Sequence, residues 1–313
     1  MFDTIIIGSG PAGLTAAIYA TRREMKTLVI GKELGGQIIW AGEIANYPGF
    51  KNISNFELIE RFRDQAVFCG AELKEAEVKK IEKKEDGTFL VITSKEDFLA
   101  RTVIIAMGLS PRRLAVDGEI EFHGKGVSYC ANCDGPLYKG KRVAVIGGGN
   151  AAFDAAEFLS KIATKVYLIH RNSEFKAFDV LIEEVKSKNN VEIITNALIK
   201  KISGENTVNK LIYTDKETTI EKEIEIDGVF VEVGRIASTD LVVDYVDRND
   251  KLQIMVNNRG ETKTSGLFAA GDVTNASEYK QITVATGQAT IAALAAYQYI
   301  QQKENIRKEV RDY

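Results

Sequence analysis

The sequence has little of the material that hydrolytic and metal sites use. Its 313 residues include two histidines and three cysteines. With so few histidines and no Gly-x-Ser-x-Gly motif, a Ser-His-Asp hydrolase has almost nothing from which to build its triad. A structural zinc site needs four ligands, and apart from one Cys-x-x-Cys pair the chain offers only Cys69, His123 and His170. We therefore expect no metal site.

The chain also lacks an excess of charge and a long apolar run. Its net charge is −3, and its acidic and basic residues are interspersed. The sequence therefore contains no cluster of basic residues that would bind nucleic acid. No apolar run reaches the roughly 18 to 20 residues that span a bilayer. The N-terminus enters an apolar strand without a basic signal region. We expect a soluble, cytoplasmic protein that binds neither nucleic acid nor membranes, and at about 150 residues per domain its length indicates two domains.

What the chain does contain is the run Cys130-Ala131-Asn132-Cys133-Asp134, a vicinal cysteine pair followed by an acid. Such a pair cycles between dithiol and disulfide through a reactive thiolate, and a neighbouring carboxyl group can exchange the protons. The pattern therefore predicts a disulfide reductase with Cys130, Cys133 and Asp134 as its catalytic residues. Half of a zinc site, a static disulfide and two idle thiols are the other interpretations of the pair.

A strand, a glycine turn and a helix follow one another at the N-terminus. Thr4–Ile7 is an apolar run, Gly8–Gly13 is a Gly-x-Gly-x-x-Gly turn, and Leu14–Glu24 carries helix-forming residues. The first glycine permits the tight turn, the second lets a diphosphate approach the backbone, and the third lets helix and strand pack closely. The pattern predicts a dinucleotide site. The acid expected after the next strand, Thr27–Ile30, is displaced to Glu33.

The same pattern recurs 139 positions later. Lys141–Ile146 is a strand, Gly147–Ala152 is a turn of the Gly-x-Gly-x-x-Ala kind, Phe153–Lys161 continues as a helix, and Val166–Ile169 is the next strand. The recurrence is much harder to obtain by accident than either match alone. It predicts that the chain binds two nucleotides or has duplicated one nucleotide-binding domain.

A third pattern lies near the C-terminus. Thr264–Asp272 predicts a short buried strand that ends in Gly-Asp, and an acid there accepts hydrogen bonds from hydroxyl groups of a ligand; the alternative is an aspartate that caps a turn. Ile282–Ile300 contains no charged residue and predicts a mostly buried helix. The positive end of this helix would stabilise a reduced, anionic ring.

In their order, these motifs resemble the low-molecular-weight thioredoxin reductases and the flavin subunits of alkyl hydroperoxide reductase. The resemblance extends from Asp3 to about Ile300. Besides the two glycine turns and the cysteine pair, it rests on Gly35-Gly36-Gln37, Asn46–Phe50, His170-Arg171, Gly266–Asp272 and Tyr279-Lys280-Gln281.

The resemblance implies an α/β fold of two Rossmann-like three-layer nucleotide-binding domains, the second inserted in the first. Residues 1–115 and 237–313 would form the FAD-binding domain, and residues 116–236 the NAD(P)H-binding domain with the redox cysteines. Two connections, Pro111–Ala115 and Gly234–Ser238, would act as hinges, and each does follow an apolar strand with a proline or glycine break; ordinary loops are the alternative. We expect the inserted domain to rotate between two positions, and members of this family are usually homodimers.

The resemblance also assigns site residues. Cys133 would face the flavin and start the exchange, with Asp134 supplying or removing the proton, whereas general thiol chemistry favours Cys130 as the low-pKa nucleophile. The expected residues for the nicotinamide nucleotide are Gly147, Gly149, Asn150, Ala151, His170, Arg171 and Lys176. The expected FAD-binding residues are Gly8, Ser9, Gly10, Pro11, Ala12, Gly13, Glu33, Gly36, Gln37, Asn46, Val78, Gly271, Asp272, Lys280, Gln281 and Ile282.

The region that would distinguish NADPH from NADH departs from the family pattern. NADPH-dependent members have His-Arg-Arg with another arginine four positions later, whereas this chain has Asn172 and Lys176 in place of two arginines, and Glu174 adds negative charge. Losing one charge-assisted hydrogen bond, worth roughly 1.5 to 3 kcal/mol, costs about tenfold or more in preference for the phosphate. We therefore expect FAD together with NADH, or with both NADH and NADPH. Strict NADPH use and another donor such as ferredoxin are the alternatives, and the intact second glycine turn disfavours ferredoxin.

The expected electron acceptor is a separate thioredoxin or glutaredoxin-like protein. The cysteine motif and Tyr279–Gln281 look closer to the peroxide-reductase flavoproteins, but those carry an extra N-terminal thioredoxin-like domain that this chain lacks. The alternatives are a flavin component of a peroxiredoxin system, a redox sensor without turnover, and an oxidase that passes electrons to oxygen.

Overall fold

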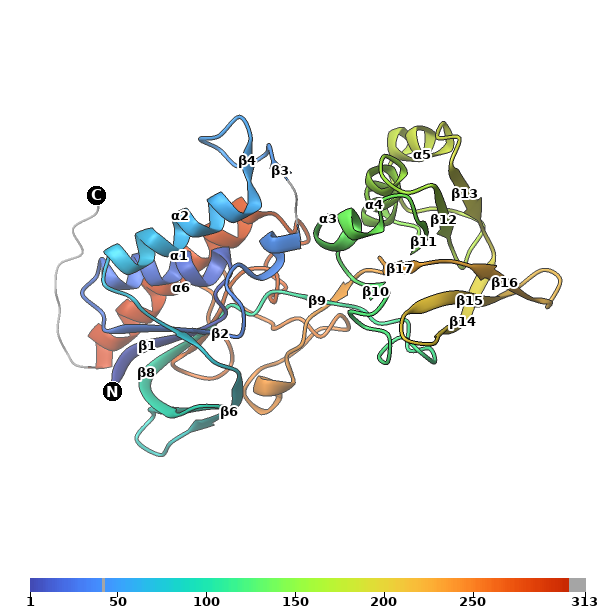
Figure 1. The fold of residues 1–313 in the computed structure, drawn as a ribbon. Coiled ribbons are helices and arrows are strands. Elements are labelled where there is room, and N and C mark those ends of the chain that lie inside the picture. Colours follow the sequence, from blue (N-terminus) through green and yellow to red (C-terminus); the bar gives the residue numbers. More distant parts are fainter. Residues whose placement is uncertain (41–42, 304–313) are drawn as a thin grey trace. The chain divides into compact units, whose positions relative to one another are not determined.

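The computed structural model describes residues 1–40 and 43–303. The chain forms two compact units (Figure 1). The first contains Met1–Ser110 and the chain from Ile236 onward, and the second contains Pro111–Arg235. The second unit is therefore an insertion in the sequence of the first.

The two segments that connect the units pair with each other. Strand β9 (Ser110–Pro111) lies beside β18 (Arg235–Ile236) in a two-stranded sheet. Next to this pair, the backbone N–H of Arg112 donates to the carbonyl oxygen of Gly234 at 2.9 Å. The chain thus leaves and re-enters the first unit through one short ladder.

The first unit is built on a sheet whose central strands are parallel. An antiparallel hairpin, β6 and β7, extends it beyond β8. From edge to edge the strands are β5 (Glu72–Glu75), β2 (Thr27–Gly31), β1 (Phe2–Ile7), β8 (Asp97–Ile105), β7 (Phe89–Thr93) and β6 (Val78–Lys83), and β19 (Leu267–Ala269) also pairs with β8.

Three helices cover one face of this sheet (Figure 1): α1 (Pro11–Thr21), α2 (Asn55–Phe68) and α6 (Ile282–Lys303). Successive residues of a strand point to opposite faces. On β1, Ile6 therefore packs in the core beneath the helices, whereas Ile5 and Ile7 pack in a second core with Phe89 of β7. The shorter elements of this unit are η1 (Gly36–Trp40), β3 (Glu43–Ile44), β4 (Ile53–Ser54) and η3 (Asp240–Tyr245).

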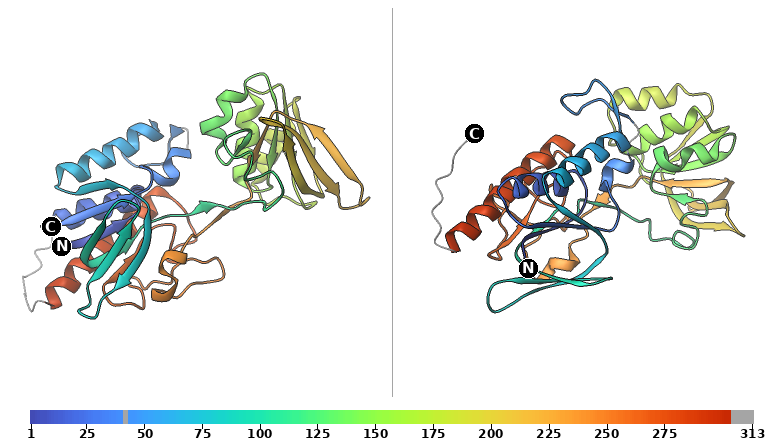
Figure 2. Two further views of the ribbon diagram at one scale, coloured as in Figure 1. Left: turned by 60° about the horizontal axis from the view of Figure 1, so that its bottom comes forward. Right: turned by 60° about the vertical axis from the view of Figure 1, so that its left-hand side comes forward.

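The second unit also has three layers (Figure 2). Its central sheet is wholly parallel and has the order β10 (Val127–Ser128), β17 (Gly228–Val231), β11 (Arg142–Ile146), β12 (Lys165–Ile169) and β13 (Val191–Ile194). One face is covered by α3 (Ala131–Asp134), η2 (Gly135–Tyr138), α4 (Asn150–Ser160) and α5 (Asp179–Lys186). The other is covered by the antiparallel sheet β14 (Ala197–Gly204), β15 (Val208–Asp215) and β16 (Glu221–Glu225).

In each unit the strand order reverses next to the strand that precedes a glycine turn. From β1 the chain builds β2 and β5 on one side before it adds β8 on the other. From β11 it builds β12 and β13 on one side before it adds β17 on the other. Open α/β sheets bind ligands at the carboxyl ends of the strands beside such a reversal. The expected α/β fold with two Rossmann-like units is confirmed, and the topology points to two binding crevices.

The secondary structure agrees with the sequence prediction except at some boundaries. The helix predicted at Leu14–Glu24 begins three residues earlier, because Pro11 occupies its first turn, where a missing N–H costs nothing. It ends at Thr21, and Glu24 has a φ of +62°, which a helix does not allow. The chain therefore turns into β2 sooner than the helix-forming residues suggested.

Candidate active site

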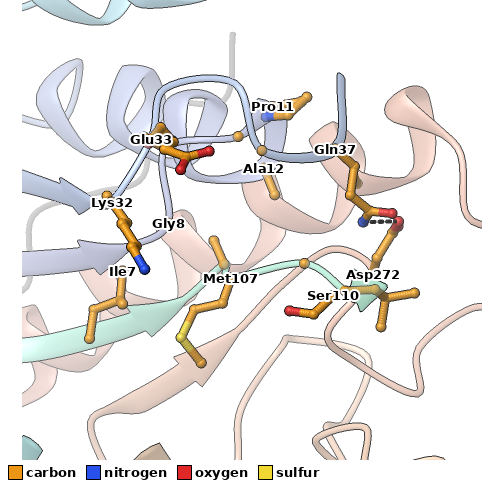
Figure 3. Close-up of a pocket in the computed structure, with 18 of the residues that line it drawn as sticks. Ile7, Gly8, Pro11, Ala12, Lys32, Glu33, Gln37, Met107, Ser110 and Asp272 are labelled. Carbon is orange, nitrogen blue, oxygen red and sulfur yellow. Dashed lines mark hydrogen bonds between the residues drawn. The ribbon is translucent and has the colours of Figure 1, made fainter. Parts of the chain in front are cut away.

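The first crevice is a cavity of about 660 Å³ at the ends of β1 and β8 (Figure 3). The three glycines of its turn have distinct steric surroundings. A Cβ on Gly8 would lie 2.2 Å from the carbonyl oxygen of Ala106, and one on Gly13 would lie 1.8 Å from that of Gly8. A Cβ on Gly10 would meet nothing closer than 3.6 Å. Gly8 and Gly13 therefore permit tight packing, whereas Gly10 leaves the backbone open to a ligand.

A second glycine loop lies against this turn. Gly35 N–H donates to the carbonyl oxygen of Ser9 at 3.0 Å, and Ser9 Oγ donates to the carbonyl oxygen of Glu33 at 2.8 Å. These bonds hold the loop after β2 beside the first glycine turn. The Glu33 side chain is exposed at the edge of the cavity, where Figure 3 shows it near Lys32.

Two hydrogen bonds join the beginning of the chain to its end. Gln37 Nε2 donates to Asp272 Oδ2 at 3.0 Å, and this bond is drawn in Figure 3. Asn46 Nδ2 donates to Gln281 Oε1 at 3.1 Å. Both pairs are separated by 235 positions in the sequence. The Gly-Gly-Gln loop and the Gly-Asp strand end, which the sequence analysis treated as separate motifs, therefore form one wall.

Lys280 holds the loop that follows Asp272. Its Nζ donates to three carbonyl oxygens, those of Asp272 at 3.2 Å, Thr274 at 3.1 Å and Ser277 at 2.8 Å. Burial lowers the pKa of this ammonium group. Lys280 therefore acts as an internal cross-link that holds the backbone of Asp272 at the cavity.

The structure distributes the expected FAD-binding residues between the cavity and its supports. Those that line the cavity are Gly8, Ser9, Gly10, Pro11, Ala12, Glu33, Gly36, Gln37, Val78, Asp272, Lys280, Gln281 and Ile282. Gly13, Asn46 and Gly271 are not in the lining. Gly13 packs under the turn, and Gly271 N–H donates to Gln288 Oε1 of α6 at 2.9 Å.

The segment Met107–Ser110 also lines the cavity, although no sequence motif indicated it. The available signal was its position directly after the apolar strand Thr102–Ala106, because the carboxyl ends of neighbouring parallel strands meet at one edge of a sheet. Figure 3 shows the side chains of Met107 and Ser110 in this part of the cavity.

The second crevice is a cavity of about 490 Å³ in the inserted unit. A Cβ on Gly147 would lie 2.3 Å from the carbonyl oxygen of Glu232, and one on Gly148 would lie 2.3 Å from Nδ1 of His170. A Cβ on Gly149 would meet nothing within 4 Å. The expected residues that line this cavity are Gly147, Gly149, Asn150, Ala151, His170, Arg171 and Lys176. Each glycine turn therefore has two glycines that pack tightly against the protein and one, Gly10 or Gly149, whose surroundings are open.

The loop after β12 folds back over the second turn. Lys176 N–H donates to the carbonyl oxygen of Gly148 at 2.7 Å, and Phe178 N–H donates to Asn150 Oδ1 at 2.9 Å. His170 Nε2 lies 3.1 Å from the carbonyl oxygen of Glu174, which can only accept, so Nε2 carries a proton. Burial lowers the pKa of His170, which favours the neutral imidazole. Arg112 and Arg113, which belong to the expected hinge Pro111–Ala115 and had no expected binding role, also line this cavity.

The cysteine pair lies in the inserted unit at the start of α3. Cys130 and Cys133 form a disulfide, and Cys133 N–H donates to the Sγ of Cys130 at 3.1 Å. Cys130 is buried and Cys133 is exposed. Ser128 Oγ donates to Asp134 Oδ2 at 2.6 Å and accepts from Cys130 N–H at 3.0 Å. Asp134 is therefore hydrogen-bonded through one serine to the backbone of the first cysteine.

Among residues 1–40 and 43–303, no group of three or more histidine, cysteine and acidic side chains is arranged to hold a metal ion. In the same part of the chain, every helix is too short or too polar to cross a membrane. Cys69, the third cysteine, is partly exposed and forms no disulfide.

Known proteins resemble this chain along most of its length. A family model described as pyridine nucleotide-disulphide oxidoreductase matches residues 2–289. The thioredoxin reductase of Treponema pallidum is 38% identical over 306 residues, which cover 97% of this chain and 99% of that protein. A Bacillus subtilis protein named NADH dehydrogenase is 38% identical over 96% of this chain, and the chain spans 58% of its length. The crystal structure of Lactococcus lactis thioredoxin reductase matches with a TM-score of 0.88 and 32% identity, over 96% of this chain and all of that one (100%).

Proposed function

Because the chain belongs to the pyridine nucleotide-disulphide oxidoreductase family, in the group of the low-molecular-weight thioredoxin reductases, we propose that it is a thioredoxin reductase. It transfers electrons from NAD(P)H through FAD to the Cys130–Cys133 disulfide and from there to thioredoxin or a thioredoxin-like protein. The observation that carries this proposal is the disulfide itself, formed in the same unit as a nucleotide crevice and with one of its sulfur-bearing residues exposed.

In this proposal FAD binds in the crevice of the first unit, and the residues there fit it. Gly10 leaves its backbone open to a diphosphate, and the first N–H groups of α1 face the same place without helical partners. Asp272 offers a carboxylate to the hydroxyl groups of the ligand, and the beginning of α6 lines the cavity with its positive end. When bound, the flavin supplies the two-electron chemistry that links a hydride donor to a disulfide.

The nicotinamide nucleotide binds in the crevice of the inserted unit. We propose that it is NADH, or that both NADH and NADPH are used. Asn172 takes the place of an arginine, Glu174 adds a negative charge, and burial lowers the pKa of His170, which disfavours the charged form that would pair with a 2′-phosphate. Arg171 and Lys176 remain as cations for that phosphate, and a lysine is a poorer bidentate partner than an arginine.

The reduced cysteine pair transfers its electrons by thiol–disulfide exchange. One cysteine thiolate attacks a sulfur of the partner disulfide, and the other partner sulfur leaves as a thiolate. The second cysteine then attacks the mixed disulfide, which restores the Cys130–Cys133 bond and releases the partner as a dithiol. Asp134 takes up or supplies the proton of the pair, since Ser128 fixes its carboxyl group beside the first cysteine. We further propose, from the family resemblance, that the enzyme works as a homodimer.

Anaerobic titration of the purified protein tests this function. NADH and NADPH are added separately, flavin absorbance is followed, and reduction of a thioredoxin disulfide is measured under the same conditions. The proposal requires bleaching of the flavin by at least one nucleotide and turnover that is lost in both Cys130→Ser and Cys133→Ser. Turnover that persists in the double variant would refute it. Bleaching by reduced ferredoxin alone would identify the other donor class.

A further inference from the structure

Glu232 is a carboxylic acid that lines the second crevice, and neither the sequence motifs nor the resemblance gives it a role. It directly follows β17, as Gly147 directly follows β11, and these two strands flank the reversal of strand order. Their backbones are in contact: Glu232 N–H donates to the carbonyl oxygen of Ile146 at 2.8 Å. The position is therefore the one at which open α/β sheets hold their ligand.

Glu232 lines the same cavity as the open glycine, Gly149, and the first residues of α4. A dinucleotide that uses this turn has its diphosphate at the beginning of α4. An ionised carboxylate in this cavity would repel a diphosphate, and the repulsion is stronger away from bulk water. A protonated carboxyl group can instead donate a hydrogen bond to an oxygen of the ligand.

The charges around Glu232 come from several elements. Burial raises the pKa of Glu232, Arg235 beyond the end of β17 lowers it, and Asp154 on α4 raises it by repulsion; together they place the pKa at about 7. The other ionisable groups that line the cavity are Arg112, Arg113, His170, Arg171 and Lys176. Near neutral pH a substantial fraction of the protein therefore carries a neutral Glu232 before any ligand arrives.

We propose that Glu232 is protonated in the complex with the nicotinamide nucleotide and donates a hydrogen bond to it, so that nucleotide binding takes up one proton from solvent. This rests on the proposed function, which makes a nicotinamide nucleotide the occupant of the crevice. The affinity is greatest at pH values where Glu232 is already neutral. It falls as the pH rises, since the protein must then acquire the proton on binding.

The test is the binding of NAD⁺ to the oxidised holoprotein by titration calorimetry between about pH 6.8 and 8.5, a range that extends from the pKa of Glu232 to well above it. NAD⁺ transfers no hydride to the flavin, the Cys130–Cys133 disulfide does not titrate, and burial lowers the pKa of His170 away from this range. The dissociation constant should rise by up to about tenfold per pH unit above the pKa of Glu232. At pH 7.5, the heat measured in two buffers of different ionisation enthalpy should show proton uptake.

Variants separate this role from others. Glu232→Gln should bind NAD⁺ at pH 8.5 more tightly than the natural protein and with no dependence on pH. Asp154→Asn should move the loss of affinity to lower pH, because it removes a charge that favours the protonated acid. Glu183→Gln, on the exposed side of α5 and outside the cavity lining, should leave the pH profile unchanged.

Three results would contradict the proposal. A dissociation constant that does not change with pH would do so, and so would equal heats in the two buffers. Weaker binding of Glu232→Gln at every pH would show that the ionised carboxylate accepts a hydrogen bond. The same titration with NADP⁺ distinguishes the two levels of inference: if neither nucleotide binds at any pH, the proposed function fails as well, whereas binding without proton uptake refutes only the role of Glu232.

Discussion

Gln37 donates a hydrogen bond of 3.0 Å to the carboxylate of Asp272, although 235 positions separate the two residues. The first comes from η1, which follows β2 in the chain, and the second from the turn after β19. Their contact closes one wall of the first crevice with residues that a whole inserted unit separates in the sequence. The crevice therefore forms only when both parts of the first unit have folded together.

Asp272→Asn tests this wall. The amide keeps the size of the carboxylate but loses its charge, so hydrogen bonds to ligand hydroxyl groups weaken. We expect the dissociation constant for FAD to rise about tenfold or more, which corresponds to roughly 1.5 to 3 kcal/mol. Flavin fluorescence during titration of the apoprotein measures it. Asp244→Asn, at an exposed position of η3, is the matched control, and equal FAD affinity in both variants would exclude the role of Asp272.

Lys280→Met tests the internal cross-link. Methionine keeps an unbranched side chain but leaves the three carbonyl oxygens of Asp272, Thr274 and Ser277 without their shared donor. The loop should loosen, and FAD should dissociate about tenfold faster or more, as stopped-flow fluorescence would record. Lys251→Met, at an exposed position near the same loop, should change nothing. An unchanged dissociation rate in Lys280→Met would refute the cross-link.

The two cysteines should differ when each is changed alone. Cys130→Ser leaves the exposed Cys133, which a protein partner can reach, whereas Cys133→Ser leaves the buried Cys130. We expect Cys130→Ser to trap a stable mixed disulfide with a thioredoxin whose second cysteine has been replaced, and to form it at least about tenfold faster than Cys133→Ser does. Mass spectrometry of the non-reduced protein measures the rates. The opposite order would assign the attack on the partner to Cys130.

Asn172→Arg should change the choice of nucleotide. It adds the guanidinium group that NADPH-dependent relatives have in this loop, on an exposed residue of the second crevice. The ratio of kcat/KM for NADPH to that for NADH should rise about tenfold. Asn189→Arg, an exposed position outside the crevice lining, adds the same charge and should leave the ratio unchanged. An equal rise in both variants would mean that general attraction, and no specific contact, is responsible.

Glu119→Gln should destabilise the inserted unit. The carboxylate is buried and accepts from Leu114 N–H at 2.8 Å, Ala115 N–H at 2.7 Å and Tyr129 Oη at 2.8 Å. Burial and the bond to Glu119 raise the pKa of Tyr129, so this phenol remains a donor over the ordinary pH range. Replacing one accepting oxygen by an NH₂ group should cost about 3 kcal/mol.

A lower midpoint of urea unfolding, followed by circular dichroism, would record the loss. The matched control is Glu121→Gln, two positions further along the chain at an exposed site. The same midpoint for both variants would remove Glu119 from the contacts that stabilise this unit. Tyr129 directly precedes Cys130 in the chain. The hydrogen bond between Tyr129 and Glu119 therefore connects the segment Leu114–Ala115 to the surroundings of the two cysteines.

The sequence by itself determined the local structure of both crevices. A glycine is required wherever a Cβ would overlap a neighbouring backbone oxygen, as at Gly8 and Gly147, and that requirement is visible in a few consecutive residues. The apolar runs before these turns and the helix-forming residues after them likewise predicted the strand and helix on either side. The vicinal cysteines needed no tertiary information, because residues three positions apart at the beginning of a helix can form a disulfide.

Only the tertiary structure decided which distant residues meet. The contact of Gln37 with Asp272, the three carbonyl groups around Lys280 and the position of Glu232 opposite Gly147 depend on strand order, which no local pattern encodes. The difference in exposure between Cys130 and Cys133 also arises from packing. Backbone sterics act between neighbours in the chain, whereas burial and charge act between neighbours in space, and for this reason the motifs could be found in the sequence and their electrostatic environment could not.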